Sequence, residues 1–309
     1  MIKFMKFMKF AVTGGAGFVG NNIVKLLINK GHEVIVVDNL NTGKLKNLEG
    51  VLEKIKFYEI DIRNKKELEK IIHDVDGIFH EAALTIVQES FTKQEEYFDV
   101  NVKGTQNVFE IAEKYNIKVV FASSSSIYGN SKEIPINENS SKKPINPYGE
   151  TKLQDEVLAE KFLKKGVKII GLRYFNIFGK GQTGSYAGVI TKFLKNIELK
   201  KPLIIYGKGD QIRDFIHVKD IAEANFTIMV SDIGKGFFNI GTGEANSINE
   251  LASIIIRISN HKEGISYLQP LTGDVKESKA DTRLTIQTFN WNYSINLEEG
   301  LKTLIENDV

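Results

Sequence analysis

The run Lys9-Phe-Ala-Val-Thr13 leads directly into Gly14-Gly-Ala-Gly17-Phe-Val-Gly20, and this junction decides the fold. The first run has the β-branched and aromatic residues of a buried strand, and Val19 to Asn29 repeats apolar residues at helical spacing. A glycine-rich turn between a strand and a helix is typical of the first unit of a dinucleotide-binding sheet. We therefore expect a parallel α/β fold that binds a nucleotide at this turn.

Each glycine of the motif has its own task. Gly14 and Gly17 let the backbone turn tightly and approach a pyrophosphate, while Gly20 lets the helix pack close to the sheet. The helix begins near Phe18 and Val19, where free backbone amides can face an anion. The alternative interpretation is a tight turn without a ligand.

An acidic residue stands where the ribose of a dinucleotide needs one. Asp38 ends the second strand-like run, about 20 residues after the glycine loop, and its carboxylate can accept hydrogen bonds from a ribose diol. A carboxylate repels a 2′-phosphate, and residues 39–43 contain no arginine, so NAD is favoured over NADP. Asn39 is expected beside the same ribose, and Lys44 is the nearby cation that would favour NADP.

Two later strand ends supply further cofactor candidates. Asp61 and Ile62 follow the third strand-like run and could receive the adenine edge; equally, Asp61 could cap a helix that starts near Asn64. The fourth run ends in His80-Glu-Ala-Ala83, where the small side chain of Ala82 leaves room for a cofactor. We expect His80 to be structural.

Strand-like runs and helix-period segments alternate through the first half of the chain. The strand-like runs are Lys9–Thr13, Glu33–Asp38, Lys56–Ile60, Gly77–Glu81, Lys118–Ser123 and Lys168–Tyr174, with helices such as Val19–Asn29 and Asn101–Tyr115 between them. This order predicts an α/β protein with a Rossmann-type doubly wound parallel sheet and a smaller, interleaved C-terminal substrate-binding lobe. We expect an NAD-binding domain over residues 1–175, to which residues 210–240 return, and a smaller substrate-binding lobe over residues 176–209 and 241–309.

The composition limits the possible functions. The 309 residues hold 41 lysines and arginines against 39 acidic residues, for a net charge of +2, and no cysteine. No disulfide, thiolate nucleophile or cysteine-based metal site can form, and no global field attracts nucleic acid or an anionic membrane. No apolar stretch reaches the roughly 20 residues that cross a bilayer. We expect a cytoplasmic protein without a metal, which starts at Met1, Met5 or Met8.

Two further segments contain groups suited to acid–base chemistry. A serine cluster, Ser123 to Ser126, follows a strand-like run, and Tyr148 precedes Lys152 by four residues, so that the two share one helix face. An ammonium and the positive nicotinamide ring of an oxidised cofactor both favour the phenolate form of the tyrosine. Together with the glycine loop, these residues indicate a dehydrogenase-type triad.

These motifs together resemble the extended short-chain dehydrogenase/reductases, within that group the nucleotide-sugar epimerases, and most of all the UDP-glucose 4-epimerases. The resemblance runs nearly end to end. The motifs that support it are Thr13 to Gly20, Asn101 to Thr105, Ala122 to Gly129, Tyr148 to Lys152, Leu172 to Asn176, Arg213 to Val218 and Asn239 to Gly243.

The resemblance implies an isomerase with NAD as its resident cofactor. It makes Ser124 the catalytic hydroxyl, Tyr148 the acid–base group at the carbon-four hydroxyl, and Lys152 the bridge to the nicotinamide ribose. Hydride would leave carbon four for NAD and return to the other face of a transient 4-ketose. The resemblance also assigns Asn101 and Tyr174 to the cofactor site.

For the substrate, the resemblance implies a UDP-sugar. The residues expected against it are Ser124, Ser125, Tyr148, Asn176, Val189, Tyr206, Arg213, Asp274 and Ser278. Arg213 would clamp the diphosphate with its planar guanidinium, unless it only forms a surface ion pair with Asp210 or Asp214. The segment Ser185 to Ile190 would cover the uracil and its ribose.

Two positions near the C-terminus bear on the choice of substrate. Where the resemblance implies a second diphosphate-clamping arginine, this chain has Leu271, for which Lys276 or Arg283 could substitute. Ser278 occupies the position that sets the space beside carbon two of the sugar. Its small side chain predicts that N-acetylated UDP-sugars are accepted as well as UDP-glucose and UDP-galactose.

Other functions are possible on the same scaffold. Related dehydratases have an acidic pair where this chain has Ser125 and Ser126, so dehydration and decarboxylation would lack their acid and base. The further alternatives are a reductase and a regulator that binds NAD and a sugar nucleotide without turnover. The resemblance also implies a homodimer, formed by the helices over Asn101 to Tyr115 and Tyr148 to Lys164.

Overall fold

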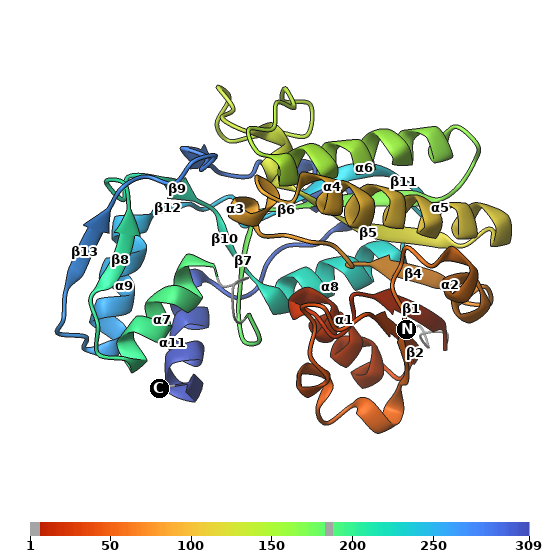
Figure 1. The fold of residues 1–309 in the computed structure, drawn as a ribbon, viewed down its shortest axis with the longest axis horizontal. Coiled ribbons are helices and arrows are strands. Elements are labelled where there is room, and N and C mark those ends of the chain that lie inside the picture. The colour runs from red at the N-terminus through yellow and green to blue at the C-terminus, as the bar shows by residue number, and fades with distance from the viewer. Residues whose placement is uncertain (1–6, 183–187, 309) are drawn as a thin grey trace.

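The computed structural model describes residues 7–182 and 188–308, and a seven-stranded sheet forms its centre (Figure 1). All neighbouring strands of this sheet are parallel, in the order β11-β6-β5-β4-β1-β2-β3. The strands are β1 (Lys9–Thr13), β2 (Glu33–Asp38), β3 (Lys56–Glu59), β4 (Gly77–His80), β5 (Lys118–Ser124), β6 (Ile169–Tyr174) and β11 (Lys235–Ile240). The strand order reverses between β1 and β4, which is where open α/β sheets bind ligands.

Helices cover both faces of the sheet, which confirms the predicted doubly wound class (Figure 1). One face has α1 (Phe18–Asn29) and α8 (Val218–Met229), and the other has α2 (Lys65–Ile72), α5 (Gly104–Tyr115) and α6 (Pro147–Leu163). Shorter elements are α3 (Val87–Ser90), α4 (Gln94–Tyr97), a π-helical turn (Phe98–Lys103) and 3-10 turns at Leu45–Leu48, Leu52–Lys54 and Ser125–Tyr128. None of the described helices is both long and apolar enough to cross a membrane.

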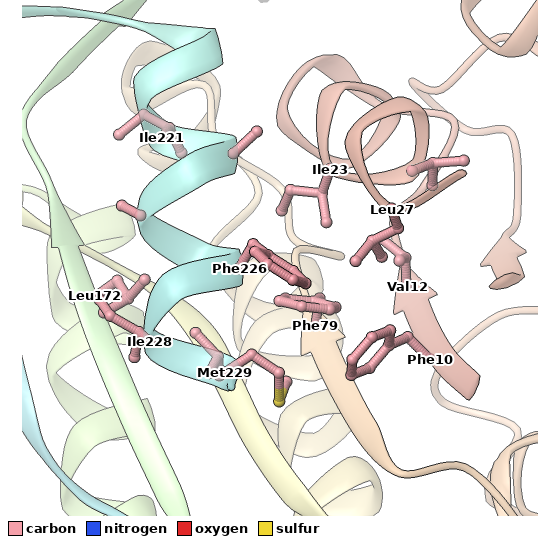
Figure 2. Close-up of a cluster of buried hydrophobic side chains, with 14 of the residues drawn as sticks. Phe10, Val12, Ile23, Leu27, Phe79, Leu172, Ile221, Phe226, Ile228 and Met229 are labelled. Carbon is pink, nitrogen blue, oxygen red and sulfur yellow. The ribbon is translucent and has the colours of Figure 1, made fainter. Parts of the chain in front are cut away.

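The sheet buries apolar side chains on both of its faces. In β1, Phe10 points to the layer of α1 and α8, and the next residue, Ala11, belongs to the opposite cluster with α2, α5 and α6. Figure 2 shows Phe226 of α8 and Ile23 of α1 above Phe79 of β4. Because both faces are covered, the strands read as continuous apolar runs, and the loops at their carboxyl ends rest on a rigid platform.

A smaller lobe lies to one side of the sheet (Figure 1). Its helices α7 (Val189–Glu198), α9 (Ile248–Ser259) and α11 (Leu297–Asp308) share a core that includes Phe193, Leu251 and Leu301. Its strands are β7 (Asn176–Phe178) with β10 (Phe215–His217), β8 (Leu203–Tyr206) with β13 (Ile265–Leu268), and β9 (Ile212–Arg213) between β12 (Asn246–Ser247) and β14 (Glu277–Ser278). A further helix, α10 (Arg283–Phe289), packs Phe289 on Phe238 of β11 with the rings 4.8 Å apart.

Most predicted elements agree with the observed ones to within one residue. The largest difference is the helix predicted from Asn101, because α5 begins at Gly104 after the π-helical turn, where the amide of Gly104 bonds to the carbonyl of Asp99. Such wide turns often occur at functional sites. This turn contains Asn101, a predicted cofactor residue.

Candidate active site

A cavity of about 730 Å³ lies at the carboxyl ends of the central strands, at the point where the strand order reverses. The predicted site residues that line it are Gly14, Gly17, Phe18, Val19, Gly20, Asp38, Asn39, Asp61, Ile62, Ala82, Ser124, Tyr148, Lys152, Tyr174 and Asn176. The fold therefore gathers the glycine loop, the ribose acid and the acid–base residues around one space.

The glycine loop has the shape that a dinucleotide needs. Gly14 has φ +69°, and a Cβ there would lie 2.6 Å from the backbone nitrogen of Ala82. A Cβ at Gly20 would lie 2.2 Å from the carbonyl oxygen of Gly14, so the start of α1 can approach the loop only without a side chain. Phe18, Val19 and Gly20 at this helix start line the cavity, and no side chain caps the helix, as a pyrophosphate site requires.

Asp38 is held at the rim of the same cavity by backbone amides. Its two carboxylate oxygens accept hydrogen bonds from Ala16 at 2.9 Å and from Leu40 at 2.8 Å. Burial raises the pKa of Asp38, against the opposite effect of these two amides. Gly43 lies against the carboxylate, because a Cβ there would be 2.8 Å from both of its oxygens.

Asp61, which lines the same cavity, is paired with Arg63, a residue that was not predicted from the sequence. Arg63 donates from Nε and Nη2 to the two oxygens of Asp61, and Asn39 donates to one of them at 2.8 Å. The guanidinium lowers the pKa of Asp61 to about 2. The alternative role of Asp61 as a helix cap is wrong, because Asn64 caps α2 by accepting from the amide of Glu67.

Tyr148 and Lys152 lie in the first turns of α6, whose start is fixed by local sequence. Asn146 caps the helix by accepting from the amide of Gly149 at 2.8 Å, and Pro147 occupies the first helical position. A Cβ at Gly149 would lie 2.8 Å from the carbonyl oxygen of Ser126, so the helix start touches the serine loop. Tyr148, one residue earlier, thus shares the cavity with the end of β5.

The serines at the end of β5 have different partners. Ser124 Oγ lies 3.1 Å from both the hydroxyl and the amide of Ser126 and lines the cavity. Ser123 donates to the buried carboxylate of Glu156 at 2.7 Å. The hydroxyl of Ser124 therefore bonds only within its own loop, whereas the hydroxyl of Ser123 bonds to Glu156 of α6.

A hydrogen-bonded chain runs from the cavity into the core and was not predicted. Tyr174 donates to Glu81 at 3.0 Å and accepts from Asn225 at 2.8 Å. Burial raises the pKa of Glu81 to about 8, against the lowering effects of Tyr174 and Lys152. The sequence signal was the acid within His80-Glu-Ala-Ala83, directly at a strand end.

One predicted role differs from what the structure contains, that of Asn101, and the structural role predicted for His80 agrees with it. Asn101 does not line the cavity: it is fully buried, donates to the carbonyl of Leu84 and to Thr151, and accepts from the amide of Leu84. It therefore fixes Leu84, which does line the cavity. His80 lies between the hydroxyls of Thr13 and Thr105, and burial lowers its pKa to about 3, as a structural histidine would have it.

A second cavity of about 400 Å³ shares Asn176 with the first and extends toward the small lobe. The predicted substrate residues that line it are Ser125, Asn176, Val189, Tyr206, Arg213, Asp274 and Ser278. Leu271 lines it too, so the substitution noticed in the sequence does face this space. Of the segment predicted to cover uracil, residues 185–187 lie outside the described residues, and α7 begins at Val189.

The cations of the second cavity differ from the predicted ones. Arg213 Nη2 lies 2.5 Å from Asp274 Oδ1, so its ion-pair partner is Asp274 and neither Asp210 nor Asp214. Lys276 and Arg283 are absent from the described cavity lining, and Arg283 instead pairs with Asp281. Lys192 of α7 also lines the cavity. It was not predicted, because the sequence does not show which face of α7 is turned toward the cavity.

The arrangement is suited to binding two anionic ligands side by side. No group of three or more His, Asp or Glu side chains in the described part of the chain is arranged to hold a metal ion. The first cavity has the glycine loop, Asp38 and the Tyr148–Lys152 pair, and the second has an arginine and a lysine. A dinucleotide in the first would meet the reacting end of a ligand in the second near Ser124 and Asn176.

Comparison with known proteins agrees with this geometry. Residues 10–241 match the NAD dependent epimerase/dehydratase family. A Pisum sativum protein, the bifunctional UDP-glucose 4-epimerase and UDP-xylose 4-epimerase 1, is 32% identical and aligns over 94% of this chain and 93% of its own. A Bacillus cytotoxicus relative, UDP-N-acetyl-alpha-D-glucosaminuronate decarboxylase, is 30% identical over 96% of both chains.

Two solved structures have nearly the same fold. The UDP-N-acetylglucosamine 4-epimerase of Methanobrevibacter ruminantium M1, in complex with UDP-N-acetylmuramic acid, superposes with a TM-score of 0.93 at 35% identity and 98% coverage of both chains. The UDP-glucose 4-epimerase of Thermotoga maritima with UDP-glucose gives 0.91 at 34% identity, with 97% of this chain and 98% of that chain covered.

Proposed function

Because the chain belongs to the NAD dependent epimerase/dehydratase family of enzymes, we propose that it uses NAD to invert carbon four of a UDP-hexose through a transient 4-ketose. The observation that most supports this reaction is the junction of the two cavities at Asn176, close to the loop of Ser124. A dinucleotide cavity that opens into a second, cationic cavity can bring a sugar carbon to the nicotinamide.

The proposed chemistry needs few groups from the protein. When bound, NAD would supply a reversible acceptor for the hydride of carbon four. Tyr148 removes the proton of the carbon-four hydroxyl and gives it back, and Ser124 donates a hydrogen bond to the same oxygen. Lys152 would hold the nicotinamide ribose from the same face of α6, one helical turn after Tyr148. Orientation by the cavity walls supplies much of the remaining rate enhancement.

The second cavity would bind the UDP part of the substrate. Arg213 is 8% exposed and faces the cavity, where a guanidinium can form paired hydrogen bonds to phosphate oxygens. Lys192 would supply the second positive charge in place of the arginine that Leu271 replaces. Asp274 would orient Arg213 and contact the ribose, and Tyr206 and Val189 would cover the uracil.

The space beside the sugar supports a broad substrate range. Ser278 is 6% exposed and lines the second cavity, so its small side chain leaves volume next to carbon two. We therefore propose that UDP-GlcNAc and UDP-GalNAc are substrates together with UDP-glucose and UDP-galactose.

The same fold also supports dehydratases and decarboxylases, and the residues after Ser124 argue against both here. Ser125 and Ser126 line the second cavity where a carboxylate would be needed to remove a proton beside the ketone. A regulator without turnover would make no catalytic use of Tyr148, Lys152 and Ser124. A reductase would use all three, but it would cause a net redox change.

We further propose that the chain forms a homodimer through α5 and α6. An open hollow of about 930 Å³ runs along α4, the π-helical turn and the start of α6. Phe98 and Val157 are apolar and 39% and 46% exposed on these elements. Val157→Glu should shift the sedimentation coefficient to that of a monomer, whereas an unchanged coefficient would disprove this interface.

One incubation tests the reaction. The protein is mixed with trace NAD and UDP-GlcNAc or UDP-glucose in D₂O, and the products are followed by NMR. Interconversion of the carbon-four epimers without solvent deuterium is expected; deuterium beside a ketone would indicate a dehydratase, and unchanged sugar a regulator. Tyr148→Phe should abolish turnover while NAD stays bound, so an active Tyr148→Phe variant would overturn the assignment of the base.

A further inference from the structure

Asp155 is an acid inside α6 that none of the roles proposed above uses. Its side chain is fully buried, and its Oδ2 lies 3.2 Å from the ammonium of Lys152. Its Oδ1 has no hydrogen-bond partner among the residues that the structure describes. A buried carboxylate with an unsatisfied oxygen costs free energy, so its presence calls for a compensating role.

Helical geometry puts Asp155 on the same face as the acid–base residues. Tyr148, Lys152 and Asp155 follow one another at spacings of four and three residues and therefore form one stripe along α6. Tyr148 and Lys152 line the cofactor cavity, and Asp155 lies behind them in the core. In the described part of the chain, Asp155 is the one hydrogen-bond partner of the Lys152 ammonium.

The adjacent acid, Glu156, has the contacts of a purely structural carboxylate. It is fully buried, and its two oxygens accept from Nε and Nη2 of Arg173 at 2.8 Å each. Ser123 donates to it as well, at 2.7 Å. Its charge is thus matched by a fixed guanidinium, whereas the charge of Asp155 acts on a lysine that faces the cofactor.

We propose that Asp155 is a positioning residue, which fixes the Lys152 ammonium at the wall of the cofactor cavity and balances its charge, an inference that rests on the proposed function. The ionised carboxylate fixes the ammonium; the protonated form leaves its positive charge uncompensated beside Tyr148. Burial raises the pKa of Asp155 to about 7, against the lowering effect of Lys152, so this change falls in the neutral range.

Several other groups surround this pair and must be separated from it. The ionisable groups on the packed elements are Tyr148 and Glu156 on α6, and His80 and Glu81 at the end of β4. His80 stays neutral because burial lowers its pKa to about 3, but Glu81 has its pKa raised to about 8. A Glu81→Gln background therefore removes the second carboxyl that titrates near neutrality.

Two substitutions at Asp155 distinguish the effect of its negative charge from the effect of its contact with Lys152. Asp155→Asn keeps an acceptor for Lys152 and removes the charge, whereas Asp155→Ala removes both. Glu160→Gln is the matched control, since Glu160 is an exposed acid on the same helix. Three quantities are measured: kcat for UDP-galactose as a function of pH, the Kd of NADH by fluorescence titration, and the melting temperature.

The expected changes differ between the variants. In Asp155→Asn the acid limb of the kcat profile moves to lower pH, because the undiminished charge of Lys152 favours the phenolate. In Asp155→Ala the Kd of NADH rises about tenfold, as expected for one lost contact of a charged group, and kcat falls. Glu160→Gln keeps the wild-type values.

Two other results would contradict the role of Asp155 or the proposed function. If both Asp155 variants keep the wild-type pH profile and NADH affinity, even with a lower melting temperature, Asp155 is only structural and the proposal is wrong. If the wild type and Glu160→Gln fail to interconvert UDP-sugars, the proposed function fails instead. The NADH titration then still tests the coupling of Asp155 to Lys152.

Discussion

Ser278 lies opposite Arg213 in the parallel ladder of β14 and β9, and the amide of Asp214 donates to the Ser278 carbonyl at 2.9 Å. Partners in such a ladder place their side chains on the same face of the sheet, and both side chains line the second cavity. The residue proposed to limit the sugar and the residue proposed to clamp the diphosphate are thus fixed relative to each other by backbone hydrogen bonds.

Ser278→Tyr should narrow the substrate range. The phenol ring would fill the space beside carbon two, so kcat/KM for UDP-GlcNAc and UDP-GalNAc should fall by about a hundredfold or more, while UDP-glucose and UDP-galactose are still converted. Ser278→Ala is the control and should keep all four substrates. Turnover of the acetylated sugars that survives the tyrosine would show that another residue sets the limit.

Arg213→Ala should weaken substrate binding more than it slows the chemical steps. Loss of a charged hydrogen bond to phosphate predicts a KM about 10 to 100 times higher for UDP-galactose, with a smaller change in kcat. Arg213→Lys should recover only part of the loss, because an ammonium cannot form the paired contact. Equal losses in kcat and kcat/KM would contradict a role in ground-state phosphate binding.

Lys192→Gln should raise the KM for UDP-galactose by up to about fivefold, the size expected for one exposed charge. The effect should shrink as salt is added, because exposed charges are screened. The control is Lys195→Gln, an exposed lysine of α7 outside the described cavity lining. Identical KM values for the two variants would remove Lys192 from the phosphate site.

Glu81→Gln should change how stability depends on pH. The folded-state pKa of Glu81 is raised from its ordinary value to about 8, so the folded protein keeps a proton that the unfolded chain loses above about pH 4.5. Its contribution to stability is therefore full at low pH and declines as pH rises to 8.

Glutamine mimics the protonated acid and does not titrate. The free energy of unfolding is measured in urea at several pH values. The value for Glu81→Gln minus the value for the wild type should increase by about 1 to 3 kcal/mol between pH 5 and pH 8. Glu160→Gln should show no such gain. A constant difference between variant and wild type over this range would mean that Glu81 is already ionised in the fold.

Much of the fold was predictable because its signals are local. The turn that starts at Gly14 requires a positive φ, the strands require continuous apolar runs, and Asn146 with Pro147 marks a helix start. The helix before Gly104 was predicted too long, since a π-helical turn has the same apolar spacing as the helix that it precedes.

The site was predictable only where one motif contained the whole signal. Tyr148 and Lys152 could be paired from their spacing, and Asp38 from its distance to the glycine loop. Arg63 and Asp155 lie two and three residues from their partners Asp61 and Lys152, but the sequence does not show that these pairs border the cavity or are buried. Glu81 and Lys192 have no such motif, and they reach their places through packing between distant elements. The same is true of Asn101, which is turned away from the cavity toward Leu84.

The sequence by itself determined the class of fold, the nucleotide loop and the spacing of the acid–base pair, because these depend on backbone freedom and helical periodicity over a few residues. Only the tertiary structure decided that Asp274 is the partner of Arg213, that Lys192 and Leu271 line the same cavity, and that the pair of Asp155 and Lys152 is buried. The reason is that charge pairing and burial depend on distances in space. Long crossovers join parallel strands, so residues that are far apart in the sequence meet in the fold. Their spacing in the sequence does not predict that contact.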